Sequence, residues 1–141
     1  MYDLLKVHHY LAFLTLILLV TILIYAVYVR LSGSSSLQLG KGLSTVTISS
    51  LHTQALLGFV MMDTYVSSLY ESGVLLSGIM KDAELRYRVL EHPFMMALAV
   101  TLATLAHVKL KKEVFSPKVI TLFVLALIAL LSRLPFDMLF S

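Results

Sequence analysis

Long apolar runs separated by short polar stretches dominate the chain, at residues 8–29, 44–69, 89–110 and 117–131. The runs 8–29, 44–69 and 89–110 reach the roughly 20 residues that a helix needs to cross a bilayer, and 117–131 is shorter. Glycine, serine and charged residues fill the stretches between them, which is the composition of turns and linkers. The charged stretch 81–88 extends the third run outward. The pattern predicts four helices, at 8–29, 44–69, 86–110 and 117–132.

Local signals mark both ends of the fourth helix and the character of the first. Pro117 suits a first helical turn, and Ser116 before it is a favourable N-cap residue. The triplet Arg133-Leu134-Pro135 stops the helix because proline cannot continue it. The first apolar run is too long for a signal peptide and lacks a small-residue cleavage site, so we expect a retained helix.

Composition places this chain in a membrane. Of its 141 residues 59% are hydrophobic and 13% are charged, with a mean hydropathy of +0.91. Soluble domains average about 45–50% apolar and about 25% charged residues, so lipid must cover much of this surface. We therefore predict one domain over residues 1–141, an all-α transmembrane four-helix bundle with up-down-up-down topology.

Charge and cysteine content exclude several classes of protein and suggest an orientation. The chain has no cysteine, which excludes disulfides, iron–sulfur clusters and covalently attached haem. The basic residues flank apolar segments and form no stripe for nucleic acid. One predicted face carries more undiluted lysine and arginine, and such a face stays in the cytoplasm. We expect a bacterial cytoplasmic (inner) membrane protein with both termini on the periplasmic side. The residues of the basic face are Arg30, Lys41, Lys109, Lys111, Lys112 and Lys118.

Four histidines fall at two matching depths of the predicted bundle. His8 opens the first helix and His92 the third, and these two helices start on the same side. His52 lies early in the second helix and His107 closes the third, which predicts a second pair on the opposite side. Neutral imidazoles ligate metals and haem iron, and ionisable groups in a membrane are functional candidates. The pattern predicts two b-type haems, held by His8 with His92 and by His52 with His107.

Spacing and helix faces support these pairs. His92 and His107 are fifteen residues apart, about 22 Å along one helix, so one ligand lies near each membrane face. Small and polar residues share a face with His8, whereas bulky aliphatics share a face with His9, so the His8 face should point inward and His8 is the predicted ligand. In the third helix the face beneath His92 carries Ala99, Ala103 and Ala106, which is likewise expected to point inward. The alternative is that the histidines are interfacial or hydrogen-bonded side chains without a metal.

Several polar residues are candidates for contacts with a cofactor. Arginines match carboxylate geometry, so Arg86, Arg88 and Arg133 are candidate partners of haem propionates, with membrane anchoring as the alternative. Glu91 could orient an imidazole, and Gln54, like Thr53, could bridge helices through hydrogen bonds. Asp63 lies well inside an apolar run and could carry protons or hold a quinone, or be a buried structural acid.

Short motifs resemble a group of small bacterial four-helix membrane proteins labelled cytochrome-b-like. They are His52-Thr53-Gln54-Ala55-Leu56-Leu57-Gly58, Met80-Lys81-Asp82, Leu85-Arg86, Glu91-His92 and Arg133-Leu134-Pro135. The resemblance implies haem b, and its opening histidine matches His8. The group commonly has arginine where this chain has Ala12. One half of a haem A synthase is also similar, with a haem between its first and third helices, but its Glu-x-x-His-Arg element is absent.

The expected function is that of a diheme b-type cytochrome. Two histidine ligands leave no open iron position, which favours electron transfer over oxygen chemistry, so we assign no catalytic residue. The expected partners are the lipid bilayer, a quinone or redox protein, and a larger respiratory or quinone-linked membrane complex or a second copy. Two alternatives stay open: a haem- or quinone-reactive enzyme using Asp63 or Glu91, and a haem-free structural subunit or small transporter.

Overall fold

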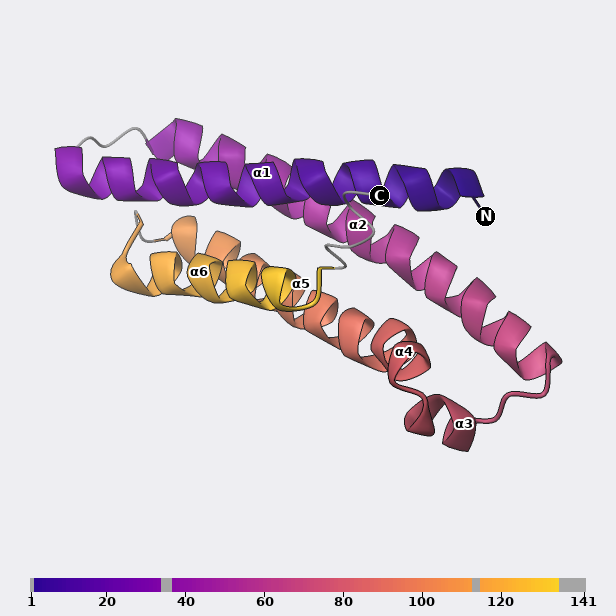
Figure 1. Cartoon of the computed structure of the whole chain (residues 1–141). Helices are drawn as coiled ribbons and strands as arrows, with labels where there is room; N and C mark the ends of the chain where they lie inside the picture. Colours follow the sequence, from indigo (N-terminus) through magenta and orange to yellow (C-terminus); the bar gives the residue numbers. More distant parts are fainter. Residues whose placement is uncertain (1, 34–36, 113–114, 135–141) are drawn as a thin grey trace.

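The fold is an all-α bundle (Figure 1). A computed structural model describes residues 2–33, 37–112 and 115–134. Pro135 and the other residues outside these ranges are not described. The described elements are α1 (Tyr2–Ser32), α2 (Leu37–Glu71), α3 (Leu76–Lys81), α4 (Ala83–Arg86), the π-helical turn η1 (Tyr87–Glu91), α5 (His92–Leu110) and α6 (Pro117–Ser132).

The observed boundaries extend two predicted helices and divide a third. The helices α1 and α2 begin well before their apolar runs, whereas α6 has the predicted bounds, with Ser116 accepting the backbone N–H of Val119. The predicted third helix is instead α4, η1 and α5 in sequence. Asp82 caps α4, since its carboxylate accepts the backbone N–H groups of Glu84 and Leu85.

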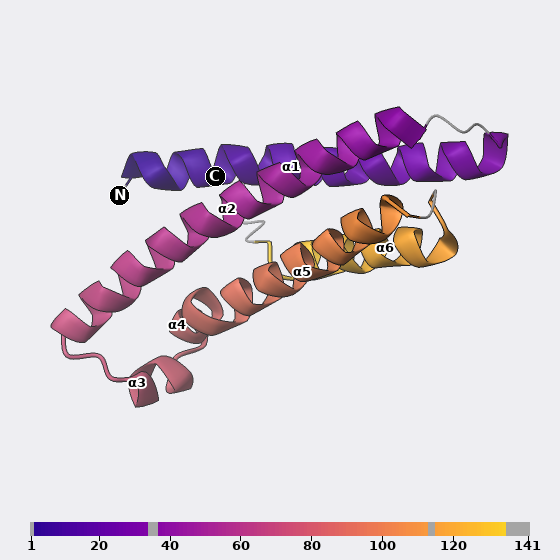
Figure 2. The same cartoon turned by 180° about the vertical axis from the view of Figure 1, so that it is seen from behind.

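The four long helices form a closed cycle of neighbours. The helix α1 packs on α2, α2 on α5, α5 on α6, and α6 returns to α1. Figures 1 and 2 show α2 crossing α1 and continuing away from it to α3, while α5 and α6 lie together on the other side. In this cycle α1 and α5 lie diagonally opposite each other, and direct contact between their described backbones is slight at most.

Contacts between α1 and α2 fix the relative depth of their residues. The hydroxyls of Thr15 and Ser50 lie 2.6 Å apart, and a side chain added at Gly40 would touch Tyr25. These antiparallel contacts keep one register along both helices.

Small side chains form much of the interior. Fully buried alanines on α5 and α6 let these helices approach closely, as is usual where helices pack in membranes. Larger buried residues, among them Leu19, Ile22 and Phe123, fill the remaining space. The face of α1 that carries His8 is buried at Thr15, Leu19 and Ala26, as predicted. The buried alanines are Ala99, Ala103, Ala106, Ala126 and Ala129.

Three described helices are long and apolar enough to cross a membrane: Asp3–Ser32, Gln38–Glu71 and Ala83–Leu110. The apolar helix α6, with 16 residues, is shorter. Large apolar side chains, including Ile17, Ile24 and Phe94, are exposed on the outside of the bundle, which is consistent with contact with a lipid bilayer. These features indicate an integral membrane protein.

Candidate functional site

His8 lies half-buried between α1 and α2, held by Gln54. The Gln54 amide donates to the His8 carbonyl oxygen at 3.0 Å and reaches the His8 Nε2 atom at 3.2 Å. Gln54 thus joins α2 to α1, whereas the hydroxyl of Thr53 donates to the Ser49 carbonyl oxygen of its own helix. Among the described residues, His8 Nδ1 and Gln54 Oε1 are buried and have no hydrogen-bond partner. Leaving such groups unpaired costs about 1–3 kcal/mol each, so this place is suited to a bound polar or metal-containing group.

His92 begins α5, and one of its ring nitrogens is fixed by a backbone contact. Its Nδ1 atom lies 2.8 Å from the carbonyl oxygen of Arg133. A carbonyl oxygen can only accept, so Nδ1 carries the proton and Nε2 keeps the lone pair that a metal would use. The His8 and His92 imidazoles lie close enough to interact electrostatically. His8 and His92 thus lie toward the same end of the bundle.

The structure does not bring His52 and His107 together. His107 is half-buried and shares a 2.8 Å hydrogen bond with Ser44 on α2. Ser44 precedes His52 by eight residues, which is about 12 Å along the helix axis. His52 itself is exposed, and its Nδ1 atom donates to the Ile48 carbonyl oxygen of its own helix at 2.8 Å.

The exposed position of His52 follows from the face of α2 on which it lies. Leu56 and Phe59, one and two turns beyond it, are 69% and 64% exposed. The buried face of α2 carries Ser44, Thr47 and Leu51 instead. Small hydroxyl residues, rather than the histidine face, therefore pack α2 against its neighbours.

Glu91 is the centre of an ion-pair cluster beside His92. Its carboxylate lies 3.0 Å from Arg86 Nε and 3.2 Å from Arg133 Nη2. Arg88 pairs instead with Glu84 at 2.7 Å. All three predicted propionate partners therefore already have a carboxylate. Exposed pairs of this kind contribute about 0–1 kcal/mol, so a bound carboxylate could exchange with them.

Asp63 lies away from these histidine contacts. It is exposed and lies in the half of α2 that leads to α3. Its predicted role in proton transfer or quinone binding has no supporting contact among the described residues.

Two residues of this region were not singled out as site residues from the sequence. Ser44 is the observed partner of His107, but one serine among several in α2 carries no signal. Tyr87 donates its hydroxyl to the Arg133 carbonyl oxygen at 2.7 Å, beside the His92 ring. The proline at position 93 is the sequence signal that could have pointed to an irregular turn here.

The side chains available as ligands determine whether a bare metal ion or a metal-containing cofactor could bind at this end of the bundle. In the described part of the chain, no three histidine, cysteine, aspartate or glutamate side chains converge to hold a bare metal ion. Haem iron needs only axial ligands from protein, because the macrocycle supplies its other donors. The fixed tautomer of His92 fits that need. His8 could ligate iron through Nε2 only after that atom gives up the hydrogen bond it accepts from the Gln54 amide.

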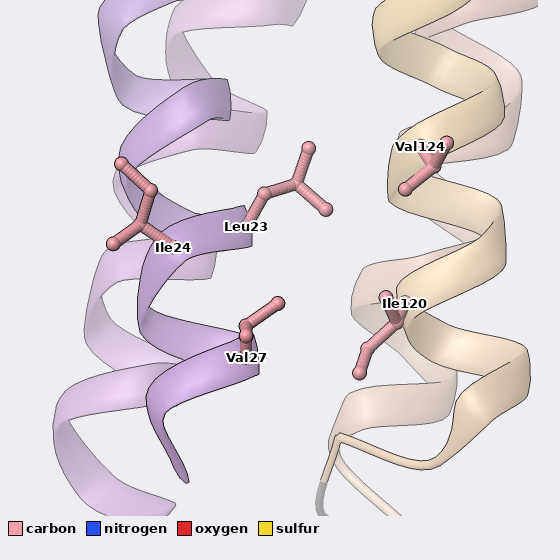
Figure 3. Close-up of a pocket in the computed structure, with 5 residues that line it drawn as sticks. All are labelled: Leu23, Ile24, Val27, Ile120 and Val124. Atoms are coloured by element: carbon pink, nitrogen blue, oxygen red, sulfur yellow. The ribbon is translucent and has the colours of Figure 1, made fainter. Parts of the chain in front are cut away.

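A groove between α1 and α6 is chemically different from the histidine site. It has a volume of about 340 Å³ and is lined by Leu23, Ile24, Val27, Ile120 and Val124. Figure 3 shows Leu23 and Val27 extending across it toward Ile120 and Val124. These aliphatic side chains offer nothing to hold a polar cofactor, so the groove suits lipid chains.

Gly58 gives His8 its space, which predicts a position-specific effect. A Cβ atom there would lie 3.2 Å from His8 Cε1, whereas one at Gly42 in the same helix would meet nothing within 4 Å. We expect Gly58→Val to destabilise the protein by about 1–3 kcal/mol through overpacking. Unfolding in detergent measures the effect. Gly42→Val is the matched control, and equal losses from both variants would contradict the proposed contact.

Comparisons with known proteins place the chain in no family. No family model matches it, and no curated protein or solved structure matches it either. The cytochrome-b-like resemblance therefore depends on its short motifs alone.

Proposed function

We propose that this chain is a transmembrane four-helix protein that binds haem b between His8 and His92 and carries electrons. The observation that carries the proposal is that these two imidazoles, from α1 and α5, lie at one end of the bundle within range of an electrostatic interaction. His92 presents Nε2 because the Arg133 carbonyl oxygen holds Nδ1. On His8 the nitrogen with the lone pair is Nε2, which would exchange the Gln54 amide for the iron.

The diagonal arrangement of α1 and α5 supports two axial ligands. Neighbouring helices pack about 8–10 Å apart, so diagonal helices are separated by more than one such distance. A separation of that kind is what two imidazoles with an iron atom between them require. Cofactor sites in helix bundles are commonly built in this way from inward side chains.

Haem b would supply one-electron chemistry when bound, and the chain would hold and tune it. His8 and His92 would hold the iron, and ligation by two histidines favours electron transfer over reactions at an open iron position. Arg86 and Arg133, which now pair with the Glu91 carboxylate, are candidates to pair with a haem propionate in its place. We further propose a location in a bacterial inner membrane with periplasmic termini, and a quinone, redox protein or larger membrane complex as partner.

The second predicted haem has less support. Its ligands His52 and His107 are separated by about two turns along the bundle, so they would need a large helix shift to share one iron. We therefore propose one haem at His8 and His92. The second site stays a prediction.

A spectrum of the purified protein tests the proposal. We expect a chain isolated in detergent after haem supply to show a low-spin reduced-minus-oxidised spectrum. Pyridine haemochrome analysis should then give one haem b per chain. Two haems would restore the second predicted site, and a high-spin spectrum would favour an enzyme with an open iron position. A colourless protein would contradict the proposal and favour a structural or transport role.

A further inference from the structure

The turn before His92 departs from α-helical geometry. In η1 the backbone N–H of His92 bonds to the Tyr87 carbonyl oxygen, five residues back. Pro93 explains the departure, because proline has no N–H and its ring clashes with the carbonyl four residues earlier in a regular helix. A single π turn relieves that clash, and such turns are frequent at functional sites.

The π turn changes which side chains share a face. Residues five apart in a regular helix point roughly 140° away from each other, at about 100° per residue. Here the Tyr87 and His92 rings have centroids 6.1 Å apart. The Tyr87 hydroxyl donates at 2.7 Å and His92 Nδ1 donates at 2.8 Å, and both reach the same Arg133 carbonyl oxygen.

The shared acceptor is a carbonyl at the end of a helix. The helix α6 ends at Ser132, so the Arg133 carbonyl has no helical partner of the usual kind. The Arg133 side chain is also held, since it pairs with Glu91 directly before His92. The end of α6 is thus fixed against the beginning of α5 at two points, one on the backbone and one on the side chain.

We propose that Tyr87 is a positioning residue that sets the strength of the hydrogen bond from His92 Nδ1. Two hydrogen bonds that share one acceptor oxygen are each weaker than either would be alone. The Tyr87 hydroxyl therefore weakens the hydrogen bond from His92 Nδ1–H to the Arg133 carbonyl oxygen. A weaker Nδ1–H bond makes Nε2 a weaker donor to a metal. The effect on a haem depends on the proposed function, whereas the effect on the His92 hydrogen bond does not.

Tyr87→Phe in the full chain tests this inference with two readouts. In haem-free protein with ¹⁵N-labelled histidine, we expect the His92 Nδ1–H proton resonance to move downfield as its bond shortens. In haem-loaded protein, we expect the oxidised-to-reduced ratio at a fixed potential to rise about threefold, the scale of one modest hydrogen bond. Tyr28→Phe, which changes an exposed tyrosine of α1, should do neither.

A second variant keeps the inference testable if Tyr87→Phe disturbs the fold. Pro93→Ala permits a regular helix, which would turn Tyr87 away and shift the His92 resonance in the same direction. Unchanged His92 signals in both variants would overturn the inference. A shifted resonance in a chain that binds no haem would support the positioning contact and refute the proposed function. Bound haem with an unchanged potential and resonance in Tyr87→Phe would refute the inference alone.

Discussion

Replacing His92 or His8 by alanine is expected to remove the bound haem. Each change deletes one of two proposed axial ligands, so the loss should exceed the 10–100-fold cost in affinity that is typical of losing a supporting residue. The ratio of haem to protein after purification measures this loss. Circular dichroism of the same samples separates loss of haem from loss of helical structure.

His9→Ala is the matched control for this experiment. His9 is next to His8 on α1 and is also half-buried, but Gln54 and Gly58 contact His8. Haem content should therefore be unchanged in His9→Ala. Haem lost from His9→Ala and kept in His8→Ala would show that the assignment of the ligand face is wrong.

Truncating Phe123 is expected to cause the largest loss of stability among single changes in the α5–α6 core. Its side chain is fully buried in the core that includes the α5 alanines. Phe123→Ala would leave a cavity that the neighbouring alanines are too small to fill, at a cost of about 3–5 kcal/mol. Denaturant titration in detergent micelles, followed by helical signal, measures the free energy of unfolding.

Phe94→Ala is the control for this loss because the same side chain is removed from a site that is 69% exposed. We expect a change within about 0.5 kcal/mol there, as for most surface substitutions. Similar losses for the two phenylalanines would mean that α6 is not packed on α5 as described.

The helices themselves and two of their inner faces could be predicted from sequence. Ser116 and Pro117 start α6 at the predicted residue, because capping and proline chemistry act locally. The His8 face of α1 and the alanines of α5 were identified as the inner faces and are buried. In these helices small and bulky residues lie on different sides, so helical periodicity alone identifies the inner face.

The inner face of α2 could not be predicted in this way. Serine, threonine, histidine and glutamine occur around its whole circumference, so no side is distinctly polar. The structure buries Ser44 and Thr47 and leaves His52 exposed. The π turn before His92 was also missed, because it depends on how Pro93 is accommodated within a continuous helix.

The helical, membrane-suited character of the chain and the residues that share a face of one helix can be read from the sequence. Those properties follow from local composition and from the fixed rise and twist of a helix. Which histidines share an end of the bundle depends on the fold, because the depth of one helix relative to another is set by contacts between them. The bond of His107 to Ser44 and the proximity of His8 to His92 are results of that register.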